Sequence, residues 1–199
     1  MLKPVVQLCL LAMSLVAWPS FAHSPIEGVG EFYNGLLHPL LIPAHVMLLL
    51  AVGIWFSQQQ KAYLPQAMIA GAVAIVIGLY CSDYVDEKTV EILPLLTAVG
   101  VGLLAVCSWR APKLVVTLVT AFSLLAIGID SGQAELFGNG KTLSHLGTFL
   151  GSLFLLLNFG LLSRRFSQVN WQAIGWRVLA SWVTAASFLV SLLQYKGMA

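Results

Sequence analysis

Residues 32–55 read FYNGLLHPLLIPAHVMLLLAVGIW, a mostly apolar run that carries two histidines and two prolines. His38 and His45 are seven positions apart, so on a regular helix they share one face and lie about 10.5 Å apart along the axis. Pro43 cannot donate a backbone hydrogen bond and its ring clashes with the preceding turn, so we expect a kinked or opened helix between the histidines. An opened turn would bring the two imidazole rings closer together. The plainer interpretation is that His38 lies at an interface and His45 makes a packing hydrogen bond.

The composition of the chain indicates a membrane protein. Of its 199 residues, 59% are hydrophobic and 9% are charged, whereas soluble domains carry roughly 25% charged residues. An ionisable side chain inside a membrane span is a candidate functional group by default. The long apolar runs predict an all-α bundle of six transmembrane helices, at about residues 38–56, 64–81, 92–109, 114–130, 143–163 and 176–194. The sequence has no basic run or basic-aromatic patch, so we do not expect nucleic acid as a partner.

The first 22 residues have the pattern of a cleaved secretory signal peptide. Lys3 supplies the positive charge, an apolar segment follows, and Ser20-Phe21-Ala22 resembles a cleavage site. Residues 23–199 would then form a single six-span domain whose N-terminus lies outside the cytoplasm. The alternative is that this segment stays uncleaved as a first transmembrane helix.

The charged residues predict the orientation of the bundle. The loops expected inside carry six basic residues and no acidic one: Lys61, Arg110, Lys113, Arg164, Arg165 and Arg177. All eight acidic residues fall in segments expected outside. Because an excess of Lys and Arg marks the cytoplasmic side, we predict a protein of the inner (cytoplasmic) membrane with both termini outside. The acidic outer face would attract cations, although ordinary topology bias also leaves an outer face poor in basic residues.

The first span also shows a family resemblance. His38, Pro39, His45 and the tail from Ala51-Val52-Gly53 to Trp55 resemble the first-span signature of the HupE/UreJ family. Members are small bacterial membrane proteins, usually with a cleaved signal and six spans, associated with nickel or cobalt uptake for hydrogenase and urease. The resemblance implies a secondary permease for a divalent transition-metal cation, bound in transit and not as a permanent cofactor.

The chain departs from that family pattern at several positions. Ala44 stands where the family has an aspartate before the second histidine, and Ile42 where it has a glycine. The family's histidine-rich stretch at the end of the fourth span corresponds to residues 127–135, which contain no histidine. A further family histidine in the fifth span corresponds to Asn158. The chain is therefore identified as a divergent member.

Five residues are predicted metal ligands: His38, His45, Asp130, Glu135 and His145. Asp130 ends the fourth span on the same outer side as His38 and, with Glu135, offers carboxylate oxygens where the family offers imidazoles. A mixed nitrogen and oxygen set suits nickel, cobalt, zinc or manganese, without selectivity among them. Asp130 could instead cap its helix or meet solvent, and His145, which opens the fifth span, could be a bystander at the interface.

A second function stays open because the chain has fewer histidines than the family pattern. The chain could be a non-transporting accessory protein that assembles or stabilises a metalloenzyme or a membrane complex. We do not expect an enzyme, because the sequence has no Gly-x-Ser-x-Gly or His-Glu-x-x-His motif. Gly147 and Gly151 form a Gly-x-x-x-Gly helix-packing signal, within one monomer or between monomers. The expected partners are thus the lipid bilayer and a transition-metal cation, and a second copy of the chain stays open as a third.

Overall fold

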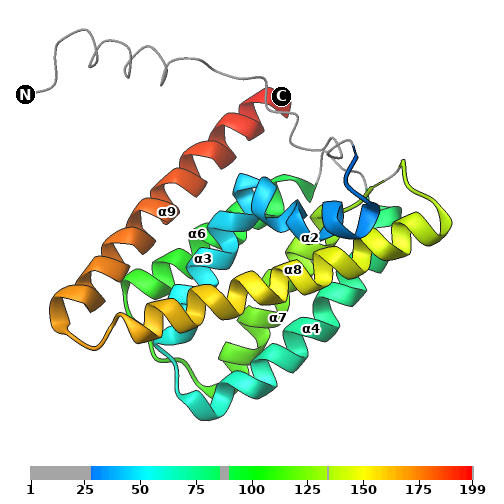
Figure 1. The fold of residues 1–199 in the computed structure, drawn as a ribbon. Helices are drawn as coiled ribbons and strands as arrows, with labels where there is room; N and C mark the ends of the chain where they lie inside the picture. Colours follow the sequence, from blue (N-terminus) through cyan, green and yellow to red (C-terminus); the bar gives the residue numbers. More distant parts are fainter. Residues whose placement is uncertain (1–27, 86–89, 134, 199) are drawn as a thin grey trace, which may run out of the picture.

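The computed structural model describes residues 28–85, 90–133 and 135–198, and helices are the only regular secondary structure in them. The predicted signal peptide at residues 1–22 lies outside the described residues. Figure 1 shows the helices packed side by side in one bundle. They run in the order α2 (Glu31–Leu41), α3 (Pro43–Ser57), α4 (Leu64–Cys81), α6 (Ile92–Val106), α7 (Lys113–Asp130), α8 (Gly138–Arg165) and α9 (Asn170–Met198). Short 3-10 turns at Lys61–Tyr63 and Ser82–Tyr84 flank α4.

The number of helices able to cross a membrane is four or five in the described part of the chain. Four pass on length and composition: α4 with its flanking turns, α7, α8 and α9. The pair α2 and α3 makes a fifth if it is one bent span. Every predicted span coincides with a helix or a helix pair, so the multi-pass helical architecture is confirmed. The predicted sixth span depends on α6, whose 15 residues fall short of the roughly 20 that a bilayer requires.

The helix expected at residues 92–109 ends early, at Val106. Ser108 has a φ of +51°, a left-handed conformation that stops a helix. Beyond it, the carbonyl of Trp109 accepts hydrogen bonds from Trp55 Nε1 and Gln59 Nε2, each at 3.0 Å. The early end therefore lets the turn after α6 dock on the end of α3.

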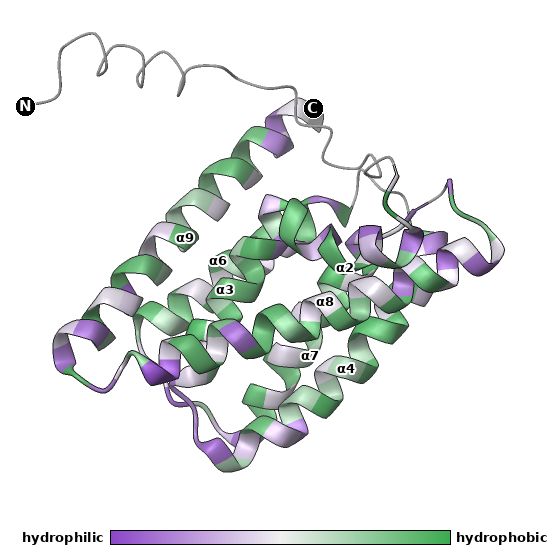
Figure 2. Ribbon diagram, in the orientation of Figure 1, coloured by the Kyte–Doolittle hydropathy of each residue, from purple (hydrophilic) through white to green (hydrophobic). Residues whose placement is uncertain are grey.

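Polar contacts join the loops at two opposite ends of α8. At one end, Arg164 Nη2 donates to the carbonyls of Ser57 and Gln59, at 2.8 and 2.6 Å. At the other end, Lys141 forms an ion pair with Asp83. Figure 2 shows the same division, with hydrophilic residues at the ends of the bundle and apolar residues along the helices. The basic loops thus share one end and acidic segments the other, which is the separation that the charge pattern predicts.

Glycines hold α2 tightly against α8. A Cβ atom on Gly35 would lie 2.0 Å from the Ser144 carbonyl oxygen, and one on Gly147 would lie 2.2 Å from that of Phe32. A Cβ on Gly151 would lie 2.3 Å from the Leu36 carbonyl oxygen. The two backbones are therefore in direct contact, and the Gly-x-x-x-Gly pair packs helices within the monomer.

Helix α3 lies in the centre and makes the core, packing against α6, α8 and α9. Its side chains Leu48, Leu49, Val52 and Trp55 are fully buried. By contrast, α9 is only 22% buried along its most apolar stretch, and large apolar side chains such as Phe188 and Leu193 lie exposed on it. An apolar outer surface of this kind suits contact with lipid.

Candidate metal-binding site

The predicted opening between the two histidines is confirmed. Helices α2 and α3 meet at an angle of 68°. The break is Ile42, which is extended, with φ −91° and ψ 112°. Pro43 then begins α3, where its missing N–H would have had no partner anyway. The bend brings the imidazole rings of His38 and His45 to a centroid separation of 5.5 Å.

The second histidine is bonded to the predicted carboxylate. His45 Nε2 lies 2.8 Å from Asp130 Oδ2, and the two side chains are 0% and 4% exposed. His45 comes from the first turn of α3, and Asp130 is the last residue of α7. A carboxylate in this position fixes the orientation of the ring. The pair also satisfies two buried polar groups whose desolvation would otherwise be costly.

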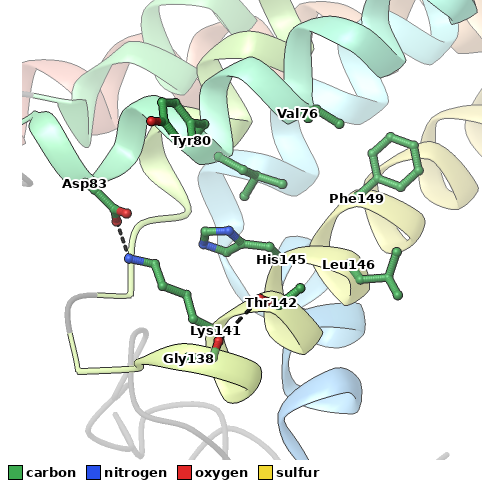
Figure 3. Close-up of a pocket in the computed structure, with 10 residues that line it drawn as sticks. Val76, Tyr80, Asp83, Gly138, Lys141, Thr142, His145, Leu146 and Phe149 are labelled. Atoms are coloured by element: carbon green, nitrogen blue, oxygen red, sulfur yellow. Dashed lines mark hydrogen bonds and ion pairs between the residues drawn. The ribbon is translucent and has the colours of Figure 1, made fainter.

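The other two predicted ligands lie elsewhere. Glu135 is exposed in the turn before α8. His145 lines a cavity of about 490 Å³ between α4 and α8, together with Tyr80, Asp83 and Lys141. Figure 3 shows its imidazole directed from α8 toward α4, while Lys141 reaches Asp83 at the mouth of the same cavity. The structure thus brings three of the five predicted ligands together.

The three residues do not form a ready-made coordination shell. Within residues 28–85, 90–133 and 135–198, no group of three or more His, Cys, Asp or Glu side chains is arranged to hold a metal ion. His45 and Asp130 contact each other directly, so a cation that bound both would have to move the ring or the carboxylate.

A second cavity connects Asp130 to the acidic end of the bundle. Its volume is about 560 Å³, and its polar lining includes Ser82, Asp83, Asp130, Gln133 and Lys141. Two of these five side chains are carboxylates and one is a lysine. A cation arriving from this end would therefore meet acceptor oxygens before it reached His45.

Sequence reasoning missed the role of Lys141 and of Gln133. Lys141 precedes His145 by four residues, so both lie on one face of α8, and both line the same cavity. The four-residue spacing could have predicted that they lie close together. Gln133 Oε1 accepts a hydrogen bond from Ser144 Oγ at 2.7 Å. No local pattern predicts that contact, because Gln133 lies in an irregular segment.

Comparison with known proteins bears on the same residues. Residues 11–190 match the family model described as HupE / UreJ protein. Neither the curated protein sequences nor the solved structures give a significant match. The matched range includes His38, His45, Asp130, Glu135 and His145, so the whole candidate site lies inside it.

Proposed function

The chain belongs to the HupE/UreJ family, and on that premise we propose that it is a secondary permease for a divalent transition-metal cation of the nickel or cobalt kind. Its apolar helices and its family make it a multi-pass membrane protein. The observation that carries the proposal is the buried His45–Asp130 pair, which stands beside His38 at the break between α2 and α3.

The donor chemistry of this cluster supports such a cargo. Two imidazole nitrogens and a carboxylate oxygen form a borderline ligand set, which nickel, cobalt and zinc accept. The family pattern resembled by the first span has an aspartate directly before the second histidine, and this chain has Ala44 there. Asp130 brings a carboxylate to His45 from α7 instead. Asp130 of α7 thus supplies the carboxylate that position 44 of α3 lacks.

Glu135 and His145 are placed where they could contact the cation before it reaches the cluster of His38, His45 and Asp130. Glu135 lies in the exposed turn that leads into α8, and His145 faces a cavity at the same end of the bundle. We place both before the His38–His45–Asp130 cluster along the route of the cation. Removing either should slow entry without abolishing binding at the cluster.

The driving force follows from charge. We propose that the acidic end faces the outside of a bacterial inner membrane, where it raises the local concentration of cations. The sequence carries no Walker-type ATP-binding motif. Inward movement would then use the membrane potential, worth about 2.3 kcal/mol per elementary charge at 100 mV. A divalent cation gains twice that amount.

The runner-up function is a non-transporting accessory protein. It is favoured by one observation: His45 and Asp130 already bond each other, as a purely structural pair would. In that case the protein would co-purify with a partner complex, and its histidines would not affect metal movement.

Uptake into proteoliposomes distinguishes the two functions. Vesicles containing the full chain, with a negative interior and an encapsulated metal sensor, should accumulate Ni²⁺ or Co²⁺ faster than empty vesicles. The double variant His38→Ala, His45→Ala should lower the rate by about tenfold or more, because it removes both nitrogen donors. Gln60→Ala, an exposed change at the basic end, is the matched control and should transport normally. Equal rates in the double variant and the wild type would refute the mechanism.

A further inference from the structure

Helix α8 carries a row of buried hydroxyls that the site described above does not use. Ser144, Thr148 and Ser152 are spaced four residues apart, so they lie along one face of the helix. All three residues are at most 1% exposed. We call them the hydroxyl row.

Two members of the hydroxyl row differ from other buried hydroxyls in the bundle. A Ser or Thr in a helix usually donates to the carbonyl three or four residues earlier. Thr120 does so to Val116, and Ser123 to Val119, each at 2.8 Å. Thr148 Oγ1 and Ser152 Oγ are fully buried, yet neither has a hydrogen-bond partner among the described residues. Because a buried hydroxyl without a partner is costly, these two positions point to a ligand that supplies one.

The outer end of the hydroxyl row meets the cavity of Asp130. Ser144 Oγ donates to Gln133 Oε1 at 2.7 Å, and Gln133 lines that cavity together with Asp130. The row is therefore linked through Gln133 to a polar space at the acidic end of the bundle. Ser144 is the member of the row that is bonded to a residue of the cavity lining.

The middle of the row runs beside the turn that holds His38. Gly151, which precedes Ser152, lies against Leu36 and Pro39, since its Cβ would come within 2.3 Å of the Leu36 carbonyl oxygen and 3.3 Å of Pro39 Cγ. Pro39 directly follows His38. Thr148 and Ser152 are thus at the depth of the candidate metal-binding site.

An apolar layer ends the row on its inner side. One turn beyond Ser152 comes Leu156, which is fully buried. It belongs to the same core cluster as Leu48, Leu49 and Val52 of α3. Polar lining therefore reaches as far as Ser152 and stops there.

We propose that the hydroxyl row holds water and forms a hydrated inlet from the Asp130 cavity to the level of His38, closed toward the basic end at Leu156. Its ligands are water molecules and the water-coordinated divalent cation. Hydroxyl oxygens replace part of a hydration shell without fixed charge, which keeps binding weak enough for release. Only the identity of the cation rests on the proposed function, because hydration of the row does not require transport.

Cysteine accessibility tests the inlet directly. In a background with Cys9, Cys81 and Cys107 replaced by serine, Ser152→Cys is compared with Ser123→Cys. Both positions are fully buried in long apolar helices, but Ser123 Oγ is bonded to its own helix. Ag⁺ added to intact proteoliposomes should block later maleimide labelling of Ser152→Cys about tenfold faster than that of Ser123→Cys, because thiols react as thiolates, which form in water. Thr148→Cys provides a second position and should behave like Ser152→Cys.

The outcomes separate this inference from the permease proposal. Fast blocking at positions 148 and 152 supports the inlet even if the wild type moves no metal, a result that would refute transport alone. Equal blocking rates at 123, 148 and 152 would overturn the inlet, even with full metal uptake by the wild type. Thermal unfolding of each cysteine variant, compared with the cysteine-free parent, confirms that the labelled protein is folded.

Discussion

Replacing Asp130 with alanine should abolish cation uptake and also destabilise the bundle, whereas Asp130→Asn should lose uptake with a much smaller loss of stability. The Asp130 side chain is 4% exposed and lies 2.8 Å from His45 Nε2. Alanine leaves that buried ring atom without its carboxylate, which costs about 1–3 kcal/mol. Asparagine keeps an oxygen acceptor for the ring but removes the negative charge that a cation needs. Uptake assays and thermal unfolding of the same two purified variants measure the two effects.

Asp83→Asn is the matched control for the stability part of this prediction. Asp83 also lines the cavity of Asp130, but its side chain is 41% exposed and its partner is Lys141. An exposed ion pair contributes about 0–1 kcal/mol, so the melting temperature should hardly change. If Asp130→Asn transported as fast as the wild type, the carboxylate would be a structural partner of His45 and not a ligand.

Replacing Gly147 with valine should separate α2 from α8 and cause a large loss of stability together with loss of uptake. The added Cβ would lie 2.2 Å from the Phe32 carbonyl oxygen and 2.5 Å from the Leu36 nitrogen. Both are backbone atoms, so the clash cannot be relieved by a side-chain rotation. Overpacking of this kind costs about 1–3 kcal/mol or more. Since α2 carries His38, the same shift would move that ring away from His45.

Two alanine variants serve as controls: one at the same crowded glycine, and one at a glycine that has free space around it. Gly147→Ala adds the same Cβ and should also destabilise. Gly100→Ala in α6 has nothing within 4 Å of the new atom and should be neutral or slightly stabilising. Melting temperatures of the three variants in one detergent suffice for the comparison. A Gly147→Ala protein as stable as Gly100→Ala would show that α2 and α8 do not pack as described.

The sequence predicted the helices and the break because those features have local causes. Apolar runs of sufficient length form helices in a membrane, and Pro43 opens the turn before it whatever the tertiary contacts are. The early end of α6 has no local cause of that kind. It occurs together with the contact between Trp109 and Gln59, which are 50 residues apart in the sequence. Contacts across such a distance cannot be read from periodicity.

The candidate site was predictable in part for the same reason. The sequence placed Asp130 and His145 at one end of the bundle, but the end of a bundle does not determine the gap between helices into which a side chain points. Consecutive residues on a helix differ in direction by about 100°. Ser144 therefore bonds Gln133, while His145, the next residue, faces α4. That rotation about α8 is set by the contact of Gly147 and Gly151 with α2.

The central claim is that His38, His45 and Asp130 together bind the cation, and X-ray absorption spectroscopy of the purified full chain loaded with one equivalent of Co²⁺ tests it most directly. The account predicts a cobalt spectrum with imidazole scattering in the wild type. It predicts weaker imidazole scattering in His45→Ala and an unchanged spectrum in Gln60→Ala. A wild-type spectrum of water oxygens alone, or one that His45→Ala leaves unchanged, would contradict the account.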